Sequence, residues 1–137
     1  MRHSLYNVAL AQSTILPAAA RTTNTTGATV DRMVDEGGFR SAMVIVHAGT
    51  VTDGTHTVEV QDSPNGSDWT AVADEYLQGS EPALTTSNDE QVHEIGYTGH
   101  QRYLRAVVTV SGSPATGGVY GVSVLLGWPR RMPPARA

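Results

Sequence analysis

The sequence contains no cysteine and no lysine, and it has few charges and few aromatic rings. All nine basic residues are arginine, charged residues make up 16% of the chain, and phenylalanine occurs once. The absence of cysteine excludes a disulfide framework, a thiolate nucleophile and a cysteine metal site. Without lysine, the chain has neither a Schiff-base lysine nor the lysine of a P-loop. These absences remove several large classes of enzyme.

Long apolar runs are also absent. No stretch approaches the ~20 apolar residues of a membrane span. Asn7 and the polar residues 12–14 interrupt the first apolar segment, so we expect no secretion signal and synthesis in the cytoplasm of the producing cell. The net charge of −4 argues against a duplex-DNA binder that relies on phosphate contacts. We therefore expect neither a membrane nor a nucleic acid as partner.

What the chain does have is a strand-like pattern over most of its length. The apolar residues 42–46 lie in a run bounded by glycines, which predicts a strand buried on both faces. Residues 55–62 alternate instead, which places Val58 and Val60 inward and Glu59 outward. The 137 residues suit one domain.

Turn signals separate the expected strands. Asp53-Gly54, residues 63–67 and residues 112–118 contain the Gly, Pro and Asn residues that favour tight turns, and we interpret all three as hairpins. Seven to eight short strands result, with a turn signal every 8–12 residues. This spacing is typical of an all-β fold, an antiparallel β-sandwich or jelly-roll-like domain.

The pattern divides the chain into an arm, a β body and a tail. Residues 1–26 hold no sustained period and are interpreted as an extended N-terminal arm, although an edge strand plus loop of the same domain fits them equally well. Residues 27–127 form the β-sandwich domain. Three prolines, which lack backbone donors, make residues 128–137 an extended Pro/Arg tail.

No constellation for catalysis or metal binding stands out. His47, His56 and His93 fall in or beside strands, where lone histidines more often make polar contacts than ligate zinc. Asp53 and the turn 62–68 offer oxygens for calcium, but the spacing of an EF-hand is missing. No paired nucleophile and base is visible. We predict a protein that is not an enzyme and has no cofactor, no metal and no small-molecule substrate.

The aromatic residues leave two interpretations open. Trp69 directly follows a turn, which predicts a ring that plugs the core and whose truncation to alanine costs about 3 kcal/mol or more. The alternative is a carbohydrate-binding module in which an exposed row of rings stacks on sugars. That row would contain Trp69, Tyr97, Tyr103 and Trp128.

Several stretches carry a resemblance to a known class of proteins. They are residues 44–49, 52–72, 95–108 and 127–131. Together they resemble small structural proteins encoded among the head genes of tailed bacteriophages. The resemblance covers residues 40–131. It lies in the general pattern of residues and includes no motif whose residues have fixed roles.

The resemblance implies a minor capsid or decoration (cement) protein. Such a protein binds the outer surface of the capsid and braces neighbouring capsomers, so its partners would be the major capsid protein and itself, as a homotrimer. It would be made in the cytoplasm of the bacterial host and reside in the virion. A tail or head-completion protein of similar fold is the alternative within the same class.

A protein of this kind acts by contact, and the ends of the chain are the segments expected to make it. The arm offers apolar side chains outside any periodic strand, and the tail combines an aromatic ring with two adjacent arginines. The predicted partner-contact residues are Leu5, Tyr6, Val8, Leu10, Trp128, Arg130 and Arg131. Deletion of residues 1–20 is expected to weaken attachment and to leave the body folded.

Overall fold

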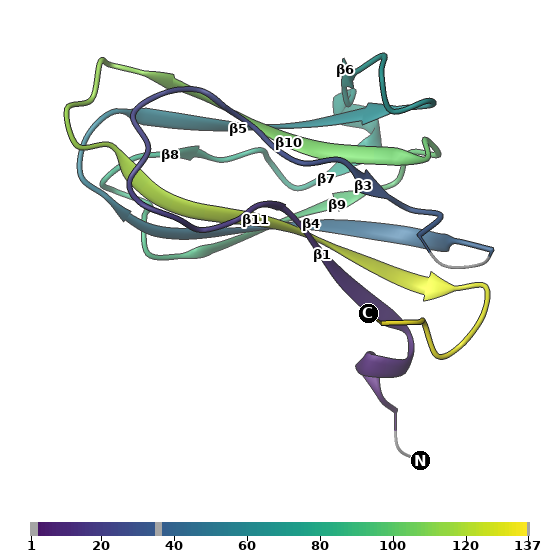
Figure 1. Cartoon of the computed structure of the whole chain (residues 1–137). Coiled ribbons are helices and arrows are strands. Elements are labelled where there is room, and N and C mark those ends of the chain that lie inside the picture. Colours follow the sequence, from purple (N-terminus) through teal and green to yellow (C-terminus); the bar gives the residue numbers. More distant parts are fainter. Residues whose placement is uncertain (1–2, 35–36, 137) are drawn as a thin grey trace.

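Two antiparallel sheets pack face to face in the computed structural model, which describes residues 3–34 and 37–136 (Figure 1). The five-stranded sheet contains, in spatial order, β1 (Ala9–Ile15), β11 (Gly118–Pro129), β4 (Phe39–Val51), β9 (Val92–Tyr97) and β7 (Leu77–Gln78). The second sheet runs from β2 (Thr25–Thr26) through β10 (Tyr103–Ser111) and β5 (Thr55–Ser63) to β6 (Thr70–Ala71). Its margins add β3 (Val30–Asp31) beside β10 and β8 (Ala83–Leu84) beside β5. The predicted all-β sandwich is confirmed.

The described residues form eleven strands, where the sequence predicted seven to eight short ones. Six strands have six residues or more, and five strands have only two. Two 3₁₀ helices, Leu5–Asn7 and Asp74–Tyr76, are the only helical elements among the described residues. None of these is long and apolar enough to cross a membrane.

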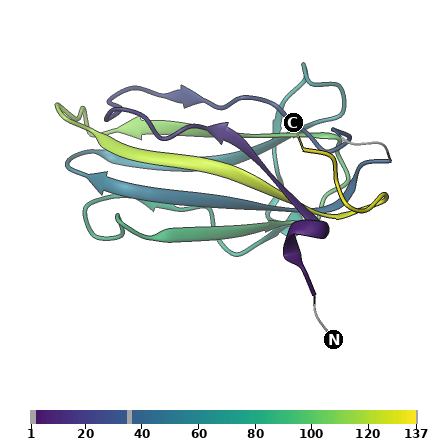
Figure 2. The ribbon, with the colours of Figure 1, turned by 60° about the horizontal axis from the view of Figure 1, so that its bottom comes forward.

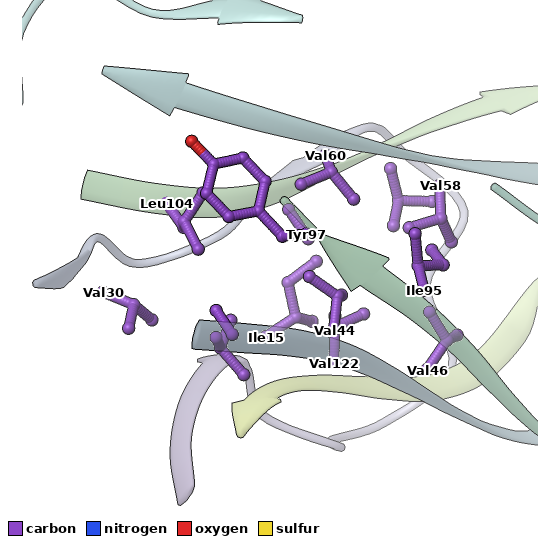
Figure 3. Packing of buried hydrophobic residues seen from close by; sticks show 14 of the residues in the cluster. Ile15, Val30, Val44, Val46, Val58, Val60, Ile95, Tyr97, Leu104 and Val122 are labelled. Carbon is purple, nitrogen blue, oxygen red and sulfur yellow. The ribbon is translucent and has the colours of Figure 1, made fainter. Parts of the chain in front are cut away.

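The core lies between the sheets and follows the period of two that a strand imposes on its side chains. Val58 and Val60 of β5 point inward, as predicted, and meet Val44 and Val46 of β4 (Figure 3). The prediction that β4 is buried on both faces is wrong. Its burial alternates, and Ile45, between the two core valines, is only partly covered. A continuous apolar run therefore lies here in a strand with one side turned outward.

Two of the three predicted hairpins are instead crossings between the sheets. The turn at Asp53-Gly54 joins β4 of one sheet to β5 of the other, and residues 112–117 join β10 to β11. Only the turn at 63–67 returns into its own sheet, where Gln61 pairs with Ala71. Turn chemistry reverses the chain direction, but it does not determine which sheet the next strand joins.

The expected arm contains a strand of the sandwich. β1 pairs with β11, and its Ile15 is 3% exposed in the core. Of the two interpretations left open for residues 1–26, the edge strand is correct for this part, because Leu10 and Ile15 both pack on the inner side. At the other boundary, β11 continues to Pro129, which pairs with Phe39 at the strand end. Deletion of residues 1–20 would therefore remove part of the core.

The side chain of Thr14 in β1 links the two sheets. Its Oγ1 donates to the carbonyl of Ala28 (2.7 Å) and accepts from the backbone N–H of Ala106 in β10 (3.2 Å). The N–H of Ala28 donates to the carbonyl of Thr14, and that of Gly27 to Ala106. A Cβ at Gly27 would lie 2.6 Å from the Ala106 carbonyl oxygen, so only glycine allows this close approach.

Asp53 joins the two crossing turns at one end of the sandwich. Its carboxylate accepts from the backbone N–H groups of Gly117 (2.5 Å), Ala115 (2.8 Å) and Thr116 (3.2 Å). These hydrogen bonds, that of Gly117 first, lower the pKa of Asp53 below its ordinary value. The charged carboxylate thus holds the β4–β5 and β10–β11 connections together.

We predict that Thr14→Val lowers the free energy of unfolding by about 2 kcal/mol. Valine keeps the shape of the side chain but leaves the buried Ala106 N–H and the Ala28 carbonyl without their partner. Urea denaturation measures the change, with Thr109→Val, an exposed position in β10, as the control expected to stay within about 0.5 kcal/mol. Equal losses in both variants would contradict the linking role of Thr14.

We also predict a specific acid sensitivity. The pKa of Asp53 is lower in the folded than in the unfolded chain, so its contribution is present above the unfolded value near 3.9 and disappears as the pH falls through the folded value. Stability should fall from about pH 5 to pH 3, and less steeply in Asp53→Asn. Urea midpoints across this range measure it. Glu75→Gln, which removes an exposed carboxylate in the 3₁₀ helix, should keep the wild-type slope.

Candidate contact surface

The outward sides of the two sheets differ in chemistry. On the sheet that contains β5 and β10, a row of polar side chains is hydrogen-bonded across the strands. Arg105 Nε donates to Gln61 Oε1 (2.9 Å), and Gln61 Nε2 donates to Glu59 Oε1 (2.7 Å). A charged and internally satisfied surface of this kind is typical of a sheet face that remains in water. We call it the polar face.

The outward side of the five-stranded sheet lacks such a row. Figure 2 brings this layer forward and shows β1, β11, β4 and β9 side by side, and Leu16 and Pro17 border its outward side near His47 and Gly121. Among its described residues, His47 and Glu94 are the only ionisable ones. We call this surface the apolar face; it is formed by Ala11, Ser13, Met43, Ile45, His47, Val92, Glu94, Ser123 and Leu125.

Three large side chains stand exposed at one end of the apolar face. Leu5 and Tyr6 lie in the N-terminal 3₁₀ helix, and Trp128 lies near the end of β11. Each is more than 60% exposed. The backbone N–H of Trp128 donates to the carbonyl of Val8 (2.9 Å), which brings the two ends of the chain together. We call Leu5, Tyr6 and Trp128 the terminal corner.

Arg136 fastens the terminal corner and was not among the predicted contact residues. Its guanidinium lies 3.6 Å from the centroid of the Tyr6 ring and donates to the carbonyls of Tyr6 (2.8 Å) and Ala9. The tail therefore folds back onto the start of the chain. An arginine among prolines gives no local signal for a contact 130 residues away, so the sequence could not reveal it.

The backbone of Trp128 adopts an uncommon conformation. Its φ is +54°, in the left-handed region that bulky side chains rarely enter. Such a conformation costs on the order of 1 kcal/mol or more. The side chain stays 62% exposed, so this conformation gains it little burial within the chain.

The remaining predicted contact residues differ in how far they are exposed. Leu10 is wrong as a contact residue, because it is 8% exposed and belongs to the core. The side chain of the next residue, Ala11, points outward from β1. Val8 is half-buried beside Trp128, and Arg130 and Arg131 lie exposed in the tail after β11. The backbone N–H of Arg130 donates to the carbonyl of Gly38 (3.0 Å).

The aromatic row of the carbohydrate alternative is not formed. Tyr97 is 4% exposed, and its hydroxyl donates to Asp62 Oδ2 (2.8 Å). Burial and this hydrogen bond raise the pKa of Tyr97 to about 12. Trp128 lies on the opposite sheet from Trp69. No four-ring platform exists to stack on a sugar.

The two rings that do share the polar face are both covered by arginine. The Arg105 guanidinium carbon lies 4.3 Å from the ring centroid of Trp69, and that of Arg102 lies 4.9 Å from Tyr103. A ring face that already stacks on a guanidinium is not free for a sugar. Trp69 is half-buried on the outside and does not belong to the core cluster, so its predicted role as a core plug is wrong.

The histidines do not converge on a metal site. His56 is fully buried in the core, with Nδ1 3.2 Å from the Tyr120 hydroxyl and Nε2 3.1 Å from the Asp53 carbonyl. His47 instead points outward on the apolar face, and His93 contacts the carbonyl of Asn88. Across residues 3–34 and 37–136, no three His, Asp or Glu residues lie close enough to hold a metal ion.

The candidate calcium turn is closed by its own hydrogen bonds. Asn65 Oδ1 accepts from the backbone N–H groups of Ser67 and Asp68, both at 2.9 Å. Asn65 Nδ2 donates to Asp68 Oδ2 (2.8 Å). The oxygens that the sequence offers to a cation therefore stabilise the turn itself.

We predict that Trp69→Ala lowers the free energy of unfolding by about 1 kcal/mol, because it removes a stacking contact with Arg105 and little core packing. Ile95→Ala, at a fully buried position, provides the reference and should cost about 3 kcal/mol. Urea denaturation of both variants measures the difference. If the two losses are equal, the ring of Trp69 packs as part of the core.

Comparison with known proteins adds no relative. No protein-family model matches the chain, and neither the curated proteins nor the solved structures contain a match to it. The apolar face, with the terminal corner at its end, is therefore the feature of the molecule from which a function can be inferred.

Proposed function

We propose that the protein is a non-enzymatic structural protein of a tailed-bacteriophage head, which binds the outer surface of the capsid and stabilises it. The observation that carries this proposal is the apolar face with its terminal corner. Met43, Ile45 and Leu125 are partly exposed there, and Val92, Leu5, Tyr6 and Trp128 are exposed. Apolar side chains gathered on one face in this way favour a site of protein interaction. The major capsid protein is the proposed partner, and the virion is the proposed location.

The chemistry of the contact fits a protein partner. Interface centres are depleted in charge and enriched in aromatic and aliphatic side chains, with polar residues around them. The middle of the apolar face has this composition through Met43, Ile45 and Leu125. Arg130 and Arg131 lie in the tail beyond its end and supply a polar rim. Burying one large apolar side chain contributes about 1.5–3 kcal/mol.

Trp128 is the proposed anchor of the contact. Tryptophan is among the residues that most often dominate binding energy when they enter a pocket on a partner. Docking would remove the Trp128 ring from water and would offset the strain of its backbone. Leu5 lines a small pocket together with Trp128, so the partner would meet an aliphatic side chain beside the ring.

The resemblance to phage head proteins supports the choice of partner. The residues that carry it, 40–131, span the long strands β4 to β11 and include Trp128 and Arg130. A tail or head-completion role would use the same contact chemistry, so the particle that the protein binds distinguishes these roles. Self-association as a homotrimer is what the resemblance implies.

We predict that the purified protein sediments with capsids that lack it and that Trp128→Ala weakens this binding by about 30-fold, the loss of one hot-spot side chain. Trp69→Ala is the matched control, because it removes the same ring from the polar face and should leave binding unchanged. Binding isotherms from co-sedimentation measure both.

Three outcomes would contradict the capsid proposal. One is the absence of wild-type binding to such capsids. Another is binding only to isolated tails, which would favour the tail role. The third is a loss with Trp69→Ala and none with Trp128→Ala, which would place the contact on the polar face. A glycan array provides the separate test of the carbohydrate alternative.

A further inference from the structure

β1 is the one long strand that lies at the edge of a sheet in the described part of the chain. It has seven residues and pairs only with β11. The strands at the other margins, β2, β3, β6, β7 and β8, have two residues each. A long edge strand presents unpaired backbone groups that can pair with another chain. The other margins are too short to do so.

The outward backbone groups of β1 can be assigned from the ladder. In an antiparallel pair, hydrogen-bonded positions alternate with positions whose N–H and C=O groups point away. Because the N–H of Trp128 donates to the carbonyl of Val8, the groups of Ala9, Ala11 and Ser13 point away from β11. Arg136 reaches the Ala9 carbonyl from that side. The outward groups of Ala11 and Ser13 make no hydrogen bond with any described residue.

Nothing in the sequence of β1 protects this edge. Natural edge strands are usually blunted by lysine, proline or other charges. The seven residues of β1 include no charge and no proline. An open groove of about 1010 Å³ runs along the strand, lined by Tyr6, Ala9, Ala11, Gln12, Val34 and Arg136 among others. The edge is therefore accessible at Ala11 and Ser13, between the Arg136 contact at Ala9 and the register shift after Ser13.

We propose that β1 of a second copy of this chain occupies this groove and pairs with β1 antiparallel about a twofold axis. Identical strands that run antiparallel are self-complementary, since each offers the donors and acceptors that the other lacks. Ala11 of each copy faces Ala11 of the other, and Ser13 faces Ala9, where the pairing displaces the Arg136 guanidinium from the Ala9 carbonyl. The chain carries a net charge of −4, but an uncharged β1 brings no like charges together at the contact.

The pairing joins the two five-stranded sheets into one continuous sheet and sets the two apolar faces side by side. It does not depend on the proposed capsid function, because it forms between copies in solution. A twofold contact produces pairs of chains, whereas the resemblance to phage head proteins implies trimers. The mass of the particle in solution therefore tests the proposal directly.

Light scattering after size exclusion should give the wild-type chain a mass of two copies, twice 14.5 kDa. Ala11→Lys places two like charges opposite each other at the axis and should halve that mass, with the circular dichroism of the fold retained. Ser123→Lys is the matched control. It adds the same charge to the same face, but one strand further in, and should keep the mass of two copies.

Cross-linking tests the register without a background, because the chain has no cysteine of its own. Ala11→Cys should give a covalent pair on mild oxidation. The Cα atoms of opposed residues in a hydrogen-bonded pair lie about 5.5 Å apart, which is within the Cα–Cα range of a disulfide. Ser123→Cys, one strand from the edge, should remain a single chain on a denaturing gel.

A wild-type mass of one chain or of three would overturn the proposal. So would a pair that Ser123→Lys dissociates and Ala11→Lys does not, since this result would place the contact on the apolar face. These readings need no capsid. Loss of capsid binding in a variant that still pairs would count against the proposed function alone.

Discussion

The hydroxyl of Thr14 is the contact on which the arrangement of the N-terminal half depends. It bonds the Ala28 carbonyl and the Ala106 N–H of the opposite sheet, so it holds β1 and the returning segment at residues 27–28 against β10. Among the described residues, no strand pairs with β1 on the side away from β11, which leaves that edge open. The start of the chain stays at the end of the sandwich, where Arg136 and Trp128 meet it.

The two outward faces show how one architecture supports two different surfaces. One side of each sheet packs into the shared core, and because side chains alternate along a strand, every second residue lies on the outward side. On β10 and β5 the outward residues include Arg105 and Glu59, which are linked through Gln61. On β4 and β11 the outward residues include Met43, Ile45 and Leu125. A chain that keeps its few charges away from one face leaves that face suited to contact with protein.

Local patterns in the sequence predicted the sandwich and the inward valines, because strand periodicity and turn residues act over a few positions. They also predicted contact roles for Leu5, Tyr6 and Trp128, whose apolar side chains the structure leaves exposed. They failed for Ile45, because a continuous apolar run gives no sign that one side of the strand faces outward. They also failed for Leu10, because the sequence did not show which side of β1 faces the core. Trp69 was misplaced for the same reason.

The sequence by itself determined the all-β class, the absence of thiol and lysine chemistry, and the alternation that builds the core. The tertiary structure alone decided which sheet each strand joins, and therefore which apolar side chains remain outside. It also decided that residues 130 positions apart, Tyr6 and Arg136, lie together. The physical reason is that burial and pairing depend on neighbours across the sandwich, which a local pattern does not contain.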